Sequence, residues 1–230
     1  MTADANEHIQ ENPLDTLLAN FARGRLSPPL HVLVASHLAI QPASRPFVRA
    51  LEEVSGAELL ETDPITVPNR DERLAAIFAS DQASPQGISI PADPRSGGAI
   101  RADGVLPHPL ERYLGRTISD IKWRTLLPGV KEFRVEDNED GEATLYWIKA
   151  GRKMPSHTHE GSEFTLVLKG AFSDLNGHYG PGDIAIADMD VDHRPIADEG
   201  EDCFCFAVTD APLQLTGPIG RIVQKLFKKH

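Results

Sequence analysis

Two histidines and a glutamate in the middle of the chain have the spacing of metal ligands. His157 and His159 are two residues apart, and Glu163 follows in the stretch KMPSHTHEGSEFTLVLKG. Residues two apart in a β-strand share a face, so a regular strand places all three on one side. Two imidazoles and a carboxylate directed into one interior are costly unless paired, and a divalent metal satisfies all three. His193, after a turn and one further strand, is the candidate fourth ligand.

The ligand types leave the metal open. A His-x-His pair alone is also common on exposed strands, where histidines are only solvated. Imidazole and carboxylate bind zinc, iron, manganese, nickel or copper. A tetrahedral zinc with four protein ligands would be nearly closed, whereas a six-coordinate metal would keep positions for water, substrate or dioxygen. We expect one divalent metal, with zinc as the first candidate and iron, manganese or nickel as alternatives.

The elements that must position these residues are short β-type runs, which begin after about Leu106. Turn clusters such as DNEDGE, LNGHYGPGD and ADEGED separate them, and this spacing predicts a sandwich or a small barrel. The runs are WRTLL at 123–127, KEFRV at 131–135, ATLYWIKA at 143–150, EFTLVLKGAF at 163–172, DIAIA at 183–187 and CFCFAV at 203–208. In a closed barrel one face of each strand is the interior, so the ligands would meet in a cavity.

The N-terminal part shows helical periodicity instead. Asn12-Pro13 and Ser27-Pro28 are start signals, a third helix is expected near residues 44–46, and Asn69 is expected to start a fourth. Short amphipathic helices need each other or a partner to bury their apolar stripes. In the fourth helix the residues expected to face inward are Leu74, Ile77 and Phe78.

A stretch rich in Pro, Gly, Ser and Asp separates the helical N-terminal part from the β-type runs. It spans residues 83–105 and shows no period, which predicts an extended linker. The sequence therefore predicts a helical domain at 1–82, a linker at 83–105 and a β domain at 106–230.

Composition narrows the classes of partner. The chain has 230 residues and a formal charge of −11, from 34 acidic and 23 basic residues. Such a surface repels phosphate backbones, so direct nucleic-acid binding is not expected and any effect on transcription should pass through another protein. The polar, acidic start and the lack of an apolar run near the roughly 18–20 residues of a membrane span predict a cytoplasmic protein without membrane contact.

Several other residues could take part in chemistry or in ligand binding. Cys203 and Cys205 would share a strand face, but neighbours at i, i+2 on a regular strand are poorly placed to form a disulfide, so buried thiols are expected. Arg152, Lys153 and Arg194 flank the candidate ligands. They are expected to be solvated charges, with binding of an anionic ligand as the alternative.

The candidate ligands carry a resemblance to the cupins. The first cupin motif, G-x5-H-x-H-x3-E-x6-G, is filled by Gly151, His157, His159, Glu163 and Gly170. In the second motif only the glycine and the histidine are kept, at Gly182 and His193, while its other fixed positions fall on Asp188, Asp190 and Ala197. The resemblance implies an all-β cupin double-stranded β-barrel, preceded here by a small all-α helical domain, with a three-His, one-Glu metal site.

The order of helical domain, linker and single cupin resembles the ChrR family of anti-sigma factors. Local matches are FARGRLS at 21–27, VASHL at 34–38, GDIAIAD at 182–188 and TDAPL at 209–213. The resemblance implies that the helical domain binds an ECF-type sigma factor and keeps it from RNA polymerase. It also implies a cupin domain tied to the response to singlet oxygen and related oxidants.

One part of the family pattern is missing from this chain. The family's N-terminal zinc site uses an upstream histidine and His-x3-Cys-x2-Cys. Here His37 is kept, Gln41 and Ser44 occupy the cysteine positions, and Asn12 matches the upstream position. One histidine does not hold a structural zinc, so we expect no N-terminal zinc and interpret His37 as a packed helix residue.

Three functions fit these features. The first is a ChrR-like regulator whose cupin metal senses an oxidant or small ligand. The second is a cupin metalloenzyme of the dioxygenase type, although no catalytic acid, base or substrate clamp stands out. The third is a ligand-binding cupin without a sigma-factor role, and a homodimer is compatible with any of them.

Overall fold

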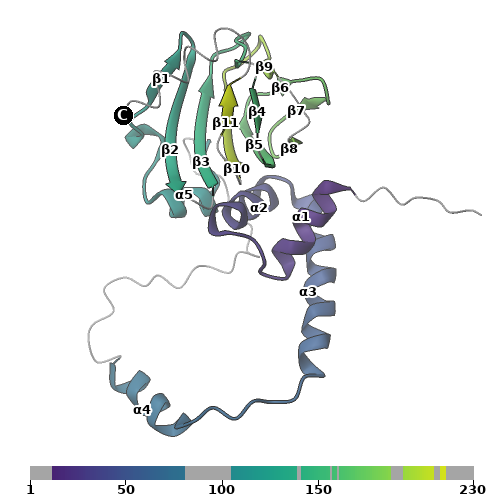
Figure 1. Cartoon of the computed structure of the whole chain (residues 1–230), viewed down its shortest axis with the longest axis vertical. Helices are drawn as coiled ribbons and strands as arrows, with labels where there is room; N and C mark the ends of the chain where they lie inside the picture. Colours follow the sequence, from purple (N-terminus) through teal and green to yellow (C-terminus); the bar gives the residue numbers. More distant parts are fainter. Residues whose placement is uncertain are drawn as a thin grey trace, which may run out of the picture.

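The computed structural model describes residues 12–80, 105–138, 141–155, 157–159, 161–187, 194–209 and 213–215. Helices α1 (Pro13–Ala22), α2 (Pro28–Ile40), α3 (Arg45–Leu60) and α4 (Arg70–Ser80) come first, with a 3-10 turn η1 (Pro42–Ser44) before α3. A β domain follows, as predicted from the sequence, and the combination of a small helical region with an all-β cupin barrel is confirmed (Figure 1). Within the described residues no helix is long and apolar enough to cross a membrane.

The helix starts follow the predicted signals. The Asn12 side chain accepts a hydrogen bond from the Leu14 amide at 3.1 Å, and Pro13 occupies the first turn of α1. Helix α2 begins at Pro28, directly after Ser27, and α4 begins directly after Asn69. A short helix α5 (His108–Leu114) and a 3-10 turn η2 (Ile118–Asp120) were not predicted, because α5 is only 7 residues long and shows too little period.

The main sheet has 6 strands in the order β1-β2-β3-β10-β5-β8, and the pairs along it are antiparallel. The predicted runs appear in it with small changes of length. Its strands are β1 (Arg124–Leu127), β2 (Val130–Asn138), β3 (Gly141–Ile148), β5 (Glu163–Lys169), β8 (Ile184–Ala187) and β10 (Cys203–Thr209).

Two small sheets complete the barrel. A 2-stranded sheet pairs β11 with β4, and a 3-stranded sheet has the order β7-β6-β9. Their strands are β4 (His157–His159), β6 (Phe172–Ser173), β7 (His178–Tyr179), β9 (Ile196–Ala197) and β11 (Leu213–Leu215). The predicted strand at 163–172 is divided between sheets, because the chain turns at Gly170, whose φ is +69°.

The two faces of the main sheet pack into two different hydrophobic clusters. Along β10, Phe206 and Val208 belong to a hydrophobic cluster shared with the helices, whereas Cys203 and Cys205 belong to a second cluster inside the barrel. This alternation follows from the two-residue period of a strand. Its consequence is that α1, α2 and α5 pack against the outer face of the sheet and share one continuous core with it (Figure 1).

The far end of the helical region leaves this core. The side chain of Val48, near the start of α3, is buried at 4% exposure, but each residue from 56 to 79 is exposed. We name residues 56–79 the exposed arm; it comprises the end of α3, the segment 61–69 and α4, and it extends away from the barrel (Figure 1). The expectation that Leu74, Ile77 and Phe78 face inward is wrong, since their exposed fractions are 41%, 63% and 66%.

Candidate functional site

Glu163 begins β5 and lines a cavity between the main sheet and the small sheets. Its side chain is buried at 6% exposure, and its Oε1 accepts a hydrogen bond from Thr165 Oγ1 at 2.9 Å. The cavity has about 540 Å³ of atom-free space, its open mouth included. Its walls are largely apolar, and they include Ile148, Met154, Phe172, Ala185 and Pro195.

His157 and His159 are the first and last residues of β4. They pair with Leu215 and Leu213 of β11, so the two histidines occupy alternate positions of one short strand, as predicted. The expectation that Glu163 belongs to the same strand is wrong. Glu163 starts β5 in the main sheet, where it pairs with Thr209 of β10 and Ala187 of β8. His157 and His159 therefore belong to the 2-stranded sheet, whereas Glu163 belongs to the main sheet.

His193 lies outside the described residues, in the segment 188–193. Ala187, directly before this segment, and Pro195, two residues after its end, both line the cavity that holds Glu163. Within the described residues, side chains of His, Cys, Asp and Glu form no group of three or more able to hold a metal ion. The four-ligand set His157, His159, Glu163 and His193 therefore stays a prediction.

The cysteines are buried free thiols, as predicted. Both lie inside the barrel, and their Sγ atoms are 3.4 Å apart. The hydrogen bond with Cys203, followed by burial, raises the pKa of the Cys205 thiol well above its ordinary value. Because the thiolate is the reactive form, this environment keeps Cys205 protonated and weakly nucleophilic.

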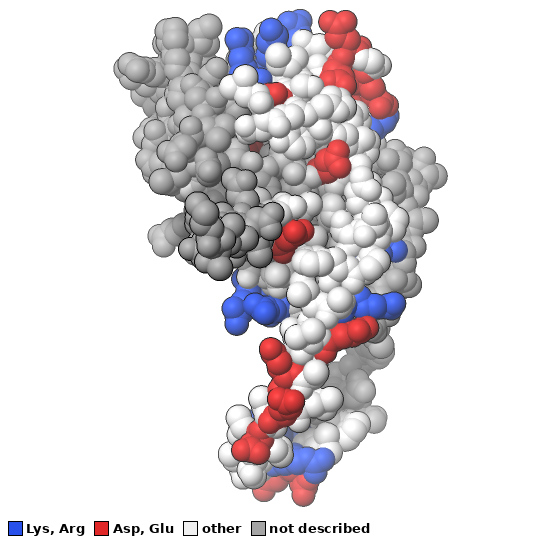
Figure 2. Space-filling view, turned by 90° about the vertical axis from the view of Figure 1, so that its right-hand side faces the viewer, with Lys and Arg blue, Asp and Glu red and all other residues white. Residues whose placement is uncertain are grey.

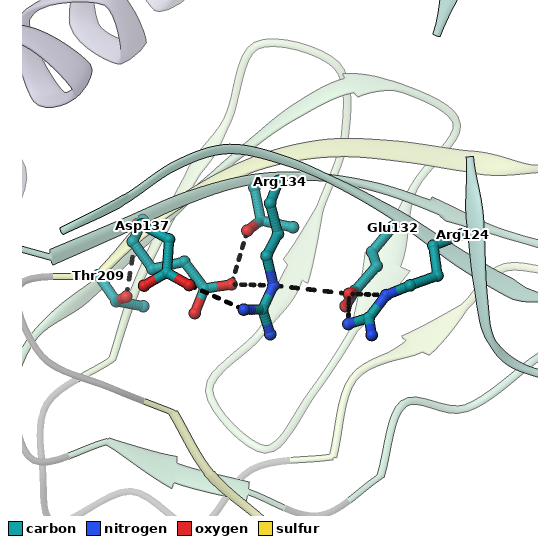
Figure 3. Close-up of polar contacts among 7 residues, drawn as sticks. Arg124, Glu132, Arg134, Asp137 and Thr209 are labelled. Carbon is teal, nitrogen blue, oxygen red and sulfur yellow. Dashed lines mark hydrogen bonds and ion pairs between the residues drawn. The ribbon is translucent and has the colours of Figure 1, made fainter. Parts of the chain in front are cut away.

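A charged network lies beside the cavity, on the face of the main sheet that also carries the cavity residue Tyr146 (Figure 3). Arg124 Nε donates to Glu132 Oε1 at 2.9 Å, and Arg134 Nη1 lies 2.8 Å from Asp137 Oδ2. Glu132 is buried at 4% exposure and pairs across the sheet with Tyr146, a cavity residue. Since each guanidinium here has carboxylate partners, the network stabilises this edge of the sheet.

Two cavity residues were missed from the sequence. Tyr146 lines the cavity, and burial raises its pKa well above the ordinary value, with Glu142, Glu163 and Glu132 adding to the effect. Thr165 lines it too and orients Glu163. The strand period could have found Thr165, because it lies two residues after Glu163 and so shares its face. The flanking charges Arg152, Lys153 and Arg194 are exposed, as expected.

His37 is packed at 3% exposure, as expected, but its partners reach beyond the helical region. Its Nδ1 lies 2.6 Å from the carbonyl oxygen of Gly182 in the barrel, and its Nε2 lies 2.9 Å from Ser44 Oγ. Gln41 Nε2 donates to the carbonyl oxygen of Pro181 at 3.3 Å. The three residues at the family's His-x3-Cys-x2-Cys positions therefore engage in polar contacts within this chain.

Comparison with known proteins finds similarity along nearly the whole chain. Residues 113–212 match the family described as the ChrR cupin-like domain. The anti-sigma-E factor ChrR of Cereibacter sphaeroides is 39% identical over 220 residues, covering 96% of this chain and 99% of the relative. The crystal structure of Rhodobacter sphaeroides SigE in complex with the anti-sigma ChrR matches with a TM-score of 0.67 and 38% identity, covering 85% of this chain and 96% of that chain. Since this similarity spans both the helical and the β part, the chain belongs to the ChrR family of anti-sigma factors.

Proposed function

We propose that this chain is an anti-sigma factor that binds an ECF-type sigma factor through its helical region and acts in the cytoplasm. The β domain would hold one divalent metal and sense an oxidant or a small ligand. The proposal keeps the predicted division into a helical domain at 1–82, a linker at 83–105 and a cupin domain at 106–230. The family membership supports it, and so does the solved relative in complex with a sigma factor.

The observation that carries the sigma-factor part is the exposed arm. Large apolar side chains on soluble proteins are normally scattered, and a concentration of them marks an interaction surface. Around the arm the exposed fractions are 56% for Val54, 71% for Leu59, 88% for Leu60, 90% for Ile65, 49% for Val67 and 66% for Phe78. Acidic and basic side chains lie beside this uncharged surface on the slender lower part of the molecule (Figure 2).

Electrostatics favour a protein partner over a nucleic acid. The formal charge of −11 opposes contact with a phosphate backbone. An apolar surface bordered by charges is instead the ordinary composition of a protein–protein interface, with a hydrophobic centre and a polar rim. A protein that regulates transcription with such a surface acts on a component of the transcription machinery rather than on DNA.

The test is binding of the full chain to the ECF sigma factor from its own source. Leu60→Asp and Phe78→Asp place a charge on the arm and should each weaken the complex about 100-fold, as expected for an interface centre. Leu175→Asp is the matched control, because Leu175 is 87% exposed but lies away from the arm, in the turn between β6 and β7 of the β domain. Wild-type chain that fails to bind the sigma factor, or equal affinity in all variants, would overturn the proposal.

The metal part rests on the chemistry of the donor set. The ChrR family and the cupin fold are generally associated with metals. The residues fit such a group: Glu163 is a buried carboxylate oriented by Thr165 in an otherwise apolar cavity, and β4 contributes a His-x-His pair. We propose that His157, His159, Glu163 and His193 hold the metal, with zinc as the first candidate. A bound metal would supply a Lewis acid or an oxygen-binding centre.

Elemental analysis of the purified protein tests this part. One metal per chain is expected, and Glu163→Ala should lose it. Thr165→Val keeps the side-chain shape and removes the hydrogen bond to Glu163, so metal affinity should fall about tenfold. Two metals per chain would contradict the expectation that the N-terminal zinc site is missing, and full metal content in Glu163→Ala would remove Glu163 from the ligand set.

A further inference from the structure

The end of α2 meets the turn between β7 and β8 in a buried polar contact. Carbonyl oxygens only accept hydrogen bonds, so His37 Nδ1 donates to Gly182 O at 2.6 Å. In the neutral ring Nε2 is then the acceptor, and the Ser44 hydroxyl donates to it at 2.9 Å. Burial lowers the pKa of His37, which agrees with a neutral ring. The imidazole therefore links the helical region to the barrel.

The fit of this contact depends on a glycine. Gly182 has a φ of +90°, and a Cβ added there would lie 2.5 Å from Gln41 Cγ and 2.8 Å from Ile40 Cγ2. Another side chain would thus combine backbone strain with direct overlap. The neighbouring Gly180 differs, since the nearest atom to its added Cβ is an Asp183 carboxylate oxygen at 3.8 Å. Of the two glycines in this turn, Gly182 is therefore the one that lies closely against the helix end.

The turn is one end of the ladder that carries Glu163 at its other end. The Gly182 amide donates to Val167 O at 2.8 Å, and the Val167 amide donates to Asp183 O at 3.0 Å. From there β8 pairs with β5 from Leu166↔Ile184 to Glu163↔Ala187. At about 3.4 Å per residue, the cavity end of this ladder lies roughly 10 Å from the end next to the turn.

Side-chain packing and one hydrogen bond connect this ladder to α3, which carries the arm. Leu166 and Ile184 lie in the same hydrophobic cluster as Leu33 and Val34 of α2. Beyond α2, Arg45 Nε donates to Leu38 O at 2.7 Å, which ties the start of α3 to the end of α2. Close-packed interiors shift between discrete arrangements rather than deforming smoothly. A displaced β8 would therefore shift α2, and with it the direction of α3.

We propose that this contact, which we name the α2–turn joint (His37, Gln41, Ser44, Pro181 and Gly182), is a metal-free regulatory joint. It transmits a change at the Glu163 end of the barrel to the helices that carry the exposed arm. In this chain Gln41 and Ser44 provide joint contacts at positions where the family pattern has cysteines. The effect on the sigma factor rests on the proposed function, whereas the transmission within the chain does not.

Hydrogen–deuterium exchange on the full chain tests the transmission without a sigma factor. Glu163→Gln and Thr165→Val change the cavity end of the ladder. Each should change exchange at the amides of 37–45 about fivefold, through altered local opening. Glu199→Gln, an exposed change on the barrel surface, is the control and should leave these amides unaffected. Using two cavity variants keeps the test decisive if one of them fails to fold.

The joint itself is tested by combining each cavity variant with Gly182→Ala or Gly180→Ala. With Gly182→Ala the change at 37–45 should disappear, while with Gly180→Ala it should persist. Transmission that survives Gly182→Ala, or cavity variants that change β5 and β8 but not 37–45, would overturn the joint. In the sigma-binding assay each cavity variant should change the affinity for the sigma factor about tenfold, and Gly182→Ala should abolish that change. If wild-type chain binds no sigma factor, the proposed function fails while the exchange result still decides the joint.

Discussion

The inner helices (α1, α2 and α5) and the exposed arm both contain large apolar residues, but these residues have opposite surroundings. Leu33 and Val34 of α2 are fully buried against the sheet, whereas Leu59 and Leu60 of α3 are 71% and 88% exposed. Charge separates the two regions as well, because α2 has no Asp, Glu, Lys or Arg, whereas α3 and α4 each have several. The inner helices have a sheet face to cover, and the arm extends beyond it (Figure 1). The inner helices therefore belong to the core, and the exposure of the arm agrees with its proposed role in binding a partner.

The largest expected effect comes from breaking the shared core on either side. Leu33→Ala in α2 and Phe206→Ala in β10 remove side chains with 0% exposure from one cluster. Each should lower the free energy of unfolding by about 3–4 kcal/mol, through lost burial and an unfilled cavity. Denaturant unfolding should show one transition for helices and barrel together. Separate transitions would show that the cluster does not join the two regions.

The next effect concerns the joint between them. Gly182→Ala introduces overlap with Gln41 and Ile40 together with strain at positive φ, and should cost about 2–4 kcal/mol in unfolding free energy. Gly24→Ala is the matched control, because Gly24 also has a positive φ of +65° but an added Cβ meets nothing within 4 Å. It should cost only about 1 kcal/mol. Equal losses would mean that backbone strain, and not the fit to α2, accounts for the effect.

A smaller effect on the free energy of unfolding should come from the titration of His37. Burial lowers the pKa of His37 below its ordinary 6.5, although Gly182 O and Asp183 oppose the shift. Between the folded and unfolded pKa values the unfolded chain binds more protons, so stability should fall as the pH drops below about 6.5. Once the pH is below the folded pKa, His37 contributes no further loss. Unfolding curves of wild type and His37→Gln from pH 8 to pH 5.5 should therefore converge towards low pH, and parallel curves would contradict this assignment.

The smallest effect on stability is expected in the arm. Leu60→Ala should change the unfolding free energy by less than about 0.5 kcal/mol, because the side chain is already 88% exposed. The same change should still weaken sigma-factor binding measurably if the arm is the interface. A stability loss comparable with that of Leu33→Ala would show that the arm is packed in solution, and the contrast between the two regions would no longer hold.

Local signals predicted most of the elements. Asn12-Pro13 and Ser27-Pro28 marked helix starts because capping and proline preferences act within a few residues. The runs around Leu145, Leu166 and Phe206 became strands because alternating apolar residues suit a two-sided sheet. Helix α5 was missed because its 7 residues, about two turns, show too little periodicity to be recognised.

The candidate site was predicted less completely. Spacing identified His157, His159 and Glu163 as candidate ligands, but it did not show that the strand ends at His159 and that Glu163 begins another strand in another sheet. Thr165 could have been found from the two-residue strand period after Glu163. Tyr146 was missed because its role depends on which face of the main sheet borders the cavity. That choice is made by the packing of the opposite face against the helices.

The sequence by itself determined the family, the two kinds of secondary structure and the residue types at the candidate metal site. The secondary structure and the candidate ligands follow from the spacing of residues close together in the sequence, and the family follows from similarity to a known relative along nearly the whole chain. Only the tertiary structure decided that His37 bonds to Gly182, 145 positions away, and that the fourth helix is exposed. The physical reason is that burial and hydrogen bonding depend on which surfaces meet in space, and a residue's neighbours along the chain do not specify them.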